Sequence, residues 1–215
     1  MRIGILGTGV VGKTLATKLT KLGHEVCMGS RTAGGDKART WVKESGGKAT
    51  EGSFADAAAH AEMVFNCTTG IASLEALKAA RAQNLQGKVL VDVSNPLDFS
   101  RGMPPTLAAC NTDSLGEQIQ REFPTAKVVK SLNTVTAALM VDPSLIPGVH
   151  TMFVSGNDAK AKAEVIDLLK TGFGWKEVID LGDITAARAQ EMYLALWMRL
   201  FGKLKTPNVN IHVVF

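Results

Sequence analysis

The stretch Ile3-Gly4-Ile5-Leu6-Gly7-Thr8-Gly9-Val10-Val11-Gly12 decides the fold of this chain, because an apolar strand runs straight into a glycine-rich turn. Each glycine has a separate physical task in a dinucleotide-binding turn. Gly7 makes the tight exit from the strand, Gly9 lets the backbone approach a pyrophosphate, and Gly12 lets the following helix pack close to the sheet. The N-terminus of that helix then offers free N–H groups to the phosphates.

The residues after the turn support this interpretation. Apolar side chains recur at helical spacing from Val11 to Leu22, and Gly23 is placed to end the helix. A second apolar run, 25–28, completes a βαβ unit of about 30 residues. The alternative is an ordinary tight turn without a ligand. The sequence favours a dinucleotide site formed by the following residues: Gly7, Thr8, Gly9, Val10, Val11 and Gly12.

Composition limits the remaining possibilities. The chain has 215 residues, 46% hydrophobic and 20% charged, which suits one globular domain or one domain with a small appendage. Its net charge of +4 is spread without a basic block interleaved with aromatics, so we expect no nucleic-acid partner. The three cysteines are scattered and unpaired in sequence, which favours the cytoplasm and predicts no metal site. We expect neither a signal peptide nor a membrane span.

The segment after the second strand indicates which dinucleotide is bound. An NAD-selective site usually has Asp or Glu here to bind the ribose hydroxyls, but this chain has Ser30 and Arg31. A hydroxyl and a guanidinium suit an adenosine 2′-phosphate, which a carboxylate would repel. Lys37 would add a second cation. The alternative is a solvated basic loop, and we predict NADP(H) rather than NAD(H).

Polar residues follow three further apolar strands, 62–67, 88–93 and 127–132. Open α/β sheets bind ligands at the carboxyl ends of their strands. The segment around Thr68 and Thr69 could equally be a simple turn with a helix N-cap. We predict that this edge completes the cofactor site with the following residues: Cys67, Thr68, Thr69, Asn95, Pro96, Asn133 and Thr134.

The whole pattern predicts an α/β fold of the Rossmann type, a doubly wound and mostly parallel sheet with a small C-terminal helical extension. Further strands are expected at 48–50, 151–154 and 175–179, and helices at 36–44, 114–123 and 158–169. A capping box at Ser53–Asp56 should begin another helix. We expect an NADP-binding domain over 1–182 and a helix-plus-tail region over 183–215.

Two late segments have patterns of their own. The last helix, 184 to about 201, is polar at Arg188, Gln190 and Glu191 and then apolar nearly all round, so it should be buried, most simply against another subunit. Residues 208–213 alternate at period two, as in an edge strand or a docked extended segment. The long loop 98–112 should be a functional cover or disordered. The extension is therefore expected to serve dimerisation and the acceptor cleft.

No catalytic residue can be assigned from the sequence. Tyr193 is the only tyrosine and has no lysine four residues later, and none of the four histidines pairs with a plausible acid or nucleophile. A dinucleotide site without a proton shuttle suggests hydride transfer between two bound ring systems. The protein would mainly place the rings face to face.

The chain resembles the NADPH-dependent coenzyme F420 reductases, the deazaflavin-dependent NADP oxidoreductases, and most of all their bacterial members. The resemblance rests on the glycine turn, on Gly29-Ser30-Arg31, on the segment 127–134 and on Ala187-Arg188-Ala189-Gln190-Glu191. It implies NADP held by the glycine turn with Ser30, Arg31 and Lys37, and a deazaflavin stacked on the nicotinamide in a homodimer. Archaeal members have a histidine where this chain has Asn133 and a proline where it has Thr136.

The resemblance leaves the small-molecule acceptor open, since many relatives occur in organisms without a deazaflavin. A flavin, a quinone or another hydride acceptor stays possible. Two other functions compete with hydride transfer to such a ring: a non-catalytic NADP-binding module that senses redox state, and a small imine or keto-acid reductase. The latter usually carries a larger helical C-terminal domain than the stretch after Leu181 provides.

Overall fold

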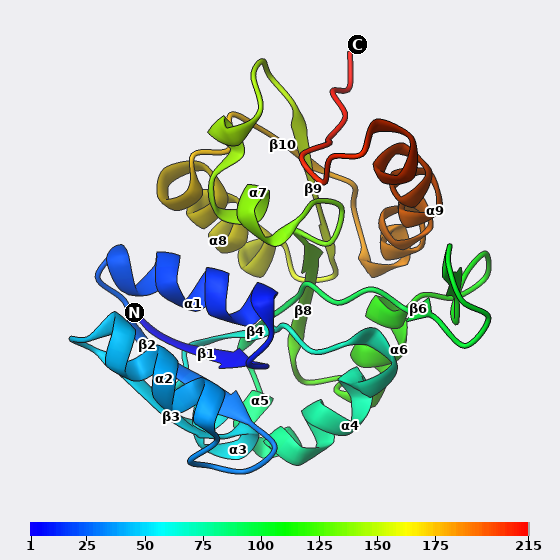
Figure 1. Ribbon diagram of the computed structural model, residues 1–215. Coiled ribbons are helices and arrows are strands. Elements are labelled where there is room, and N and C mark those ends of the chain that lie inside the picture. Colours follow the sequence, from blue (N-terminus) through cyan, green and yellow to red (C-terminus); the bar gives the residue numbers. More distant parts are fainter. Residues whose placement is uncertain (215) are drawn as a thin grey trace.

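A computed structural model describes residues 1–214 of the chain and shows three layers around one large sheet (Figure 1). The eight strands lie in the order β10-β9-β8-β5-β4-β1-β2-β3. Every neighbouring pair is parallel except β8 and β9, which are antiparallel. The strands are β1 (Arg2–Leu6), β2 (Glu25–Ser30), β3 (Ala49–Ser53), β4 (Met63–Asn66), β5 (Val89–Asp92), β8 (Lys127–Ser131), β9 (Thr151–Gly156) and β10 (Glu177–Asp180). The predicted doubly wound, mostly parallel fold is confirmed.

Helices cover both faces of the sheet, and each face has its own apolar core. In β4, Met63 and Phe65 join one core and Val64 joins the other, as the alternation of side chains along a strand requires. The first core lies under α1 (Val10–Lys21), α2 (Asp36–Ser45), α7 (Ala137–Val141) and α8 (Ala159–Asp167). The second lies under α3 (Phe54–His60), α4 (Gly70–Ala80), α5 (Ala82–Leu85) and α6 (Leu115–Glu122).

The chain reverses its winding direction beside β1. From β1 it proceeds to β2 and β3 on one side, then returns to β4, β5 and β8 on the other. The carboxyl ends of β1, β2, β4, β5 and β8 therefore share one edge, with a switch point between β1 and β4, where ligands bind in folds of this type. The predicted polar segments after β4, β5 and β8 all lie along this edge.

Local sequence signals account for several element ends. The predicted capping box is present, since Ser53 accepts a hydrogen bond from the backbone N–H of Asp56 and the Asp56 carboxylate accepts one in return. The strand before it continues to Ser53, beyond the predicted 48–50. Helix α8 continues into a π-helical turn, η2 (Leu168–Phe173), and short 3-10 turns form η1 (Pro143–Leu145) and η3 (Ile184–Ala186). Leu22, at the end of α1, is 42% exposed and does not join the core.

The loop 98–112 contains order that its composition did not predict. A small antiparallel hairpin of β6 (Leu97–Asp98) and β7 (Thr106–Leu107) extends from the body near α6 (Figure 1). Among the described residues, no helix is long and apolar enough to pass through a membrane.

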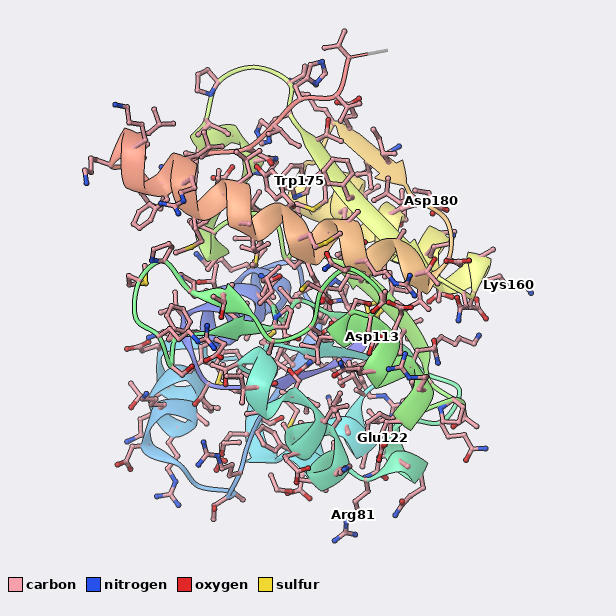
Figure 2. The ribbon with its side chains drawn as sticks, turned by 90° about the vertical axis from the view of Figure 1, so that its right-hand side faces the viewer. Arg81, Asp113, Glu122, Lys160, Trp175 and Asp180 are labelled. Atoms are coloured by element: carbon pink, nitrogen blue, oxygen red, sulfur yellow. The ribbon has the colours of Figure 1, made fainter. Side chains whose placement is uncertain are left out.

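The last helix, α9 (Ala187–Leu204), crosses the face of the molecule seen in Figure 2. Within this chain its early polar residues are buried, and the predicted burial of its apolar part against another subunit stays a prediction. Gln190 and Glu191 are among its buried residues, whereas Leu196 and Leu204 are 53% and 55% exposed within this chain. The tail beyond it is a docked extended segment, as predicted: the Ile211 carbonyl accepts a hydrogen bond from the Thr151 N–H at 2.8 Å.

Candidate functional site

The glycine turn has the geometry that its three tasks require. Gly7 has φ +124°, a conformation that side chains disfavour, and a Cβ there would lie 2.7 Å from the Cys67 carbonyl oxygen. A Cβ on Gly12 would lie 2.1 Å from the Gly7 carbonyl oxygen, so only glycine lets α1 begin this close to the turn. No atom lies within 4 Å of the corresponding point on Gly9, the N-cap of α1. The turn is therefore closely packed at Gly7 and Gly12, and it is open to a ligand at Gly9.

A first cavity of about 780 Å³ lies beside this turn and extends to the end of β2. Of the predicted residues, it is lined by Gly7, Thr8, Gly9, Ser30, Arg31, Lys37, Cys67, Thr68 and Thr69. Within the described residues, neither Arg31 nor Lys37 has a carboxylate partner, so both cations are available to an anion. Glu51 fixes the backbone of their loop, because its carboxylate accepts a hydrogen bond from the Gly34 N–H at 2.8 Å.

A second cavity of about 800 Å³ continues from the first across the sheet edge. The two share Cys67, Thr68, Thr69 and Ile71. The other predicted residues that line it are Val10, Val11, Asn95, Asn133 and Thr134. Its outer wall is apolar and includes Phe99, Leu194, Trp197 and Met198 from the hairpin and α9.

Two predicted residues line neither cavity. Gly12 lies beneath the turn, where its role is to let the helix pack. Pro96 lies behind Gly70, and a Cβ on Gly70 would come 2.9 Å from the Pro96 Cα. Cys67 lines both cavities with a thiol whose pKa is raised by burial, so it remains protonated at neutral pH. Among residues 1–214, no cluster of His, Cys, Asp and Glu forms a metal-binding group.

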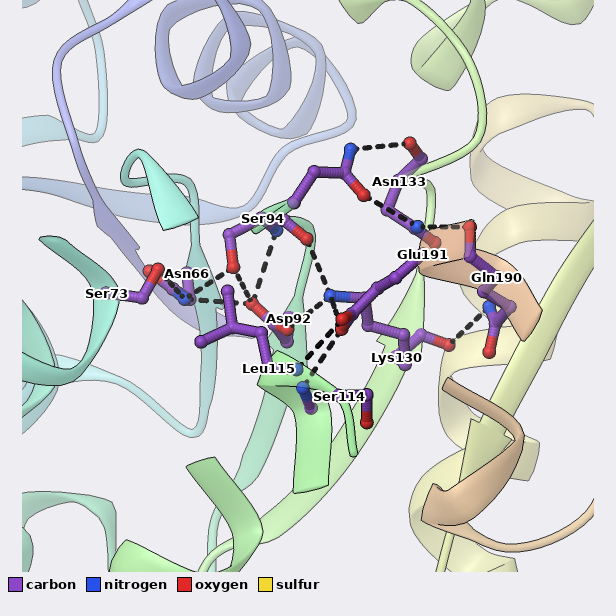
Figure 3. A network of polar contacts seen from close by, with 12 residues as sticks. Asn66, Ser73, Asp92, Ser94, Ser114, Leu115, Lys130, Asn133, Gln190 and Glu191 are labelled. Carbon is purple, nitrogen blue, oxygen red and sulfur yellow. Dashed lines mark hydrogen bonds and ion pairs between the residues drawn. The ribbon is translucent and has the colours of Figure 1, made fainter. Parts of the chain in front are cut away.

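The floor of the second cavity rests on a buried ionic network that sequence reasoning missed (Figure 3). Lys130 is fully buried, and its ammonium group lies 2.7 Å from Asp92 and 2.8 Å from Glu191. It also donates to the Ser94 carbonyl oxygen at 2.6 Å. Burial by itself lowers the pKa of Lys130, but the two carboxylates outweigh burial and the pKa is raised. The lysine is therefore charged, with all three donors used.

Both carboxylates of this network have further partners. The Asp92 carboxylate accepts hydrogen bonds from the Asn66 amide at 2.8 Å and from the Ser94 hydroxyl at 2.6 Å. Glu191 accepts from the backbone N–H groups of Leu115 and Gly116, at 2.8 and 3.0 Å. These are the first residues of α6, whose positive end favours a carboxylate. A buried charge is tolerated where every group is paired, as here.

Three polar residues of the segment 187–191, which carries the resemblance, contact α6 and the sheet. Arg188 pairs with Glu117 on α6 through its Nε at 2.8 Å, and Gln190 bonds the backbone of β8 and β9. Glu191 reaches Lys130 on β8. Three polar residues within one helical turn thus attach α9 to the sheet and to α6, and their partners lie about 35 to 75 residues away in sequence. The sequence could have indicated these contacts only if it had predicted that the polar residues of this helix are buried. The pattern instead predicted burial for the later, apolar part of the helix.

Comparisons with known proteins agree with this architecture. Residues 2–96 match the family model described as "NADP oxidoreductase coenzyme F420-dependent". A crystal structure of a candidate F420-dependent NADP reductase from Arthrobacter sp. FB24 is 55% identical, with a TM-score of 0.95 over 100% of both chains. The F420-dependent NADP reductase of Methanothermobacter marburgensis is 26% identical over 99% of this chain and 98% of its own length.

A longer protein is similar as well. The rat metalloreductase STEAP3 is 30% identical over 97% of this chain, but this chain spans only 38% of its length. The match to the Arthrobacter structure, in contrast, covers both chains completely at a high identity. This chain is therefore a member of an oxidoreductase family, that of the coenzyme F420-dependent NADP oxidoreductases.

Proposed function

We propose that this protein transfers a hydride between NADP(H) and a planar ring acceptor of the coenzyme F420 class. The observation that carries this proposal is the pair of continuous cavities at the carboxyl edge of the sheet, one cationic and one apolar. Their volumes, about 780 and 800 Å³, lie within the range of small-molecule sites. A dinucleotide across both would leave its nicotinamide facing the apolar wall.

The residues present fit NADP at its pyrophosphate and at its 2′-phosphate. The open space outside Gly9 allows backbone to approach a pyrophosphate, and the α1 N-terminus supplies N–H groups to it. Ser30, Arg31 and Lys37 line the end where a 2′-phosphate would lie. When bound, the two ring systems supply the redox chemistry, and the protein's part is to orient them and exclude water.

The wall of the second cavity is suited to orienting a ring acceptor beside the nicotinamide. Trp197 and Met198 come from α9, and Phe99 comes from the hairpin, so the acceptor would lie between the sheet edge and the C-terminal region. Among residues 1–214, those that line this cavity include no charged side chain. This lining supports a step in which a hydride passes from one ring to the other without a charged acid or base from the wall.

Residues 183–215 would form the acceptor side of the cleft and the contact between two subunits. The exposed apolar half of α9, which includes Leu196 and Leu204, supports a homodimer. Three free cysteines, Cys27, Cys67 and Cys110, support a cytoplasmic location.

Stopped-flow mixing tests the reaction directly. The protein and NADPH are mixed with F420, a flavin or a quinone, and nicotinamide oxidation is followed by absorbance. We expect rapid oxidation with at least one ring acceptor. Tight NADP binding without oxidation by any of the three would contradict the proposal and support the sensing module instead.

Replacing Arg31 by alanine should weaken NADPH far more than NADH. A charge-assisted contact to the 2′-phosphate is expected to contribute about 1.5–3 kcal/mol. Calorimetric Kd values for both cofactors would measure the difference. Lys43 lies on the same helix as Lys37 but does not line the cavity, so Lys43→Ala is the matched control and should change neither Kd. Equal losses for NADPH and NADH in Arg31→Ala would refute the assignment of the 2′-phosphate.

A further inference from the structure

The tail that follows α9, residues 205–214, runs back to β9 and contributes to the second cavity in two ways (Figure 1). Pro207 and Asn208 line the cavity directly. The Val209 carbonyl oxygen accepts a hydrogen bond from the Trp197 indole N–H at 3.3 Å, and Trp197 belongs to the outer wall. The position of the tail therefore determines how the largest side chain of this wall is oriented.

Backbone hydrogen bonds attach the far part of the tail to β9. The Ile211 carbonyl oxygen accepts from the Thr151 N–H at 2.8 Å, and the Val213 N–H donates to the Thr151 hydroxyl at 3.1 Å. Thr151 is fully buried, and its hydroxyl donates in turn to Glu177 at 2.8 Å. Between these contacts and Val209 lies Asn210, whose side chain attaches the part of the tail that is nearest to the wall.

The hydrogen bonds of Asn210 allow only one orientation of its amide. Its Nδ2 lies 3.0 Å from the Thr151 carbonyl oxygen, which can only accept, so the amide nitrogen must face β9. The same Nδ2 lies 2.9 Å from His150 Nδ1. His150 Nε2 lies 2.9 Å from the Pro143 carbonyl oxygen and must donate to it, so Nδ1 is the acceptor that Asn210 requires. Both amide N–H groups of Asn210 are therefore used.

His150 gives this contact a fixed base. The residue is 8% exposed, and its ring packs edge-on against Trp175, with 5.1 Å between the ring centroids. Trp175 is itself held, because its indole N–H donates to the Met140 carbonyl oxygen at 3.0 Å. A ring that is packed on one side and hydrogen-bonded on another keeps its place. Asn210 therefore attaches the tail to a rigid part of the molecule.

We propose that Asn210 is a positioning residue for the acceptor: it fixes the Val209 carbonyl oxygen and, through it, the Trp197 ring that forms the acceptor's wall. This inference rests on the proposed function, because it takes the second cavity as the acceptor site. Among the described residues, those that line this cavity do not include Asn210, so its effect must pass through the tail. A Trp197 ring without this support would have to be ordered when the acceptor binds, which weakens binding.

The kinetic test uses Asn210→Ala in the full chain. Removing both N–H donors should raise the KM of the acceptor about tenfold and leave kcat and the Kd of NADPH within about twofold. Steady-state oxidation of NADPH by F420, or by FMN where F420 gives no turnover, measures the first two quantities, and calorimetry measures the third. An acceptor KM that stays unchanged, or a Kd of NADPH that rises as much as the KM, would overturn the proposal.

His212→Ala is the matched control on the same tail. Its Nδ1 lies 2.9 Å from Glu177, but the His212 side chain is 42% exposed, so this pair contributes little to holding the tail. The acceptor KM of His212→Ala should stay within about twofold of the wild-type value. A KM that rises as much in His212→Ala as in Asn210→Ala would show that any loosening of the tail has this effect, and would remove the special role of Asn210.

Acrylamide quenching of tryptophan fluorescence gives a readout that needs no acceptor. The chain has three tryptophans, and Trp41 and Trp175 are each 1% exposed, so quenching reports mainly on Trp197. Asn210→Ala should raise the quenching constant, because Trp197 loses its fixed partner, and His212→Ala should leave it at the wild-type value. Equal quenching of Asn210→Ala and the wild-type protein would contradict the link from the tail to the wall.

A double variant tests whether the effect passes through Trp197. Trp197→Phe keeps an aromatic ring and removes the indole N–H, so it separates the wall from the tail. Adding Asn210→Ala to Trp197→Phe should then raise the acceptor KM no further. An equal rise in both backgrounds would overturn the role of Trp197. Failure of the proposed function gives a different result: the wild-type protein would reduce no ring acceptor, while the quenching difference between Asn210→Ala and the wild type would remain.

Discussion

Replacing Lys130 by methionine should destabilise the protein by about 3–5 kcal/mol, because it leaves two buried carboxylates facing each other without a cation. Asp92 is 0% exposed and Glu191 is 1% exposed, so water cannot take the place of the lysine. The measurement is urea unfolding followed by circular dichroism at pH 7. The raised pKa of Lys130 means that its contribution is fully present at this pH and is lost only as the pH rises through that value.

Lys127 offers a matched control on the same strand. It pairs with Asp158 at 3.5 Å, and the two side chains are 38% and 34% exposed. Lys127→Met should therefore cost at most about 1 kcal/mol. If Lys130→Met unfolded at the same urea concentration as Lys127→Met, the buried network would not stabilise the fold as inferred.

A second variant separates the lost charge from the lost volume. Lys130→Met combined with Asp92→Asn and Glu191→Gln removes all three charges and keeps side chains of similar size. It should recover part of the stability lost in Lys130→Met, because no carboxylate is then left buried and unpaired. A triple variant as unstable as the single one would indicate that packing, not charge, explains the loss.

The sheet could be predicted from the sequence because the buried strands of a parallel sheet are short apolar runs, which are visible locally. Each of the eight strands of the sheet was expected, seven of them from an apolar run, whereas β3 was expected too short, and the glycine turn identified the first βαβ unit. The polar segments after β4, β5 and β8 were placed at one edge by a general rule of parallel sheets. The structure brings those segments together as two continuous cavities.

The ionic network could not be predicted in the same way, because its members are distant in sequence. Lys130 follows the apolar pair Val128 and Val129 inside a strand, and Glu191 lies in the most polar part of the last helix. Neither residue indicates locally that the other is its partner. A charged residue within a buried strand does predict that a counter-charge lies nearby, and that signal was present at Lys130.

The three glycines of the turn make separable contributions, and this leads to the last prediction. Gly9→Ala should leave the fold intact and lower the affinity for NADP⁺ by about 10²-fold or more, since a methyl group would occupy the space that a pyrophosphate needs. The free protein has room for that methyl group, because no atom lies within 4 Å of it. Gly9 has φ −74°, which alanine adopts freely, so the only expected loss of stability is about 1 kcal/mol or less from the weaker N-cap that alanine provides.

Gly12→Ala is the matched control, with the opposite pattern. Its Cβ would lie 2.1 Å from the Gly7 carbonyl oxygen, so backbone must move, at a cost of about 3 kcal/mol or more. Thermal unfolding of the free proteins and calorimetry with NADP⁺ would measure both effects. Gly9→Ala that bound NADP⁺ normally would show that no phosphate lies over the turn. If Gly9→Ala lost as much stability as Gly12→Ala, glycine would be needed at position 9 for the structure of the turn. The unfolding experiment contains no ligand, so such a loss could not come from a ligand contact.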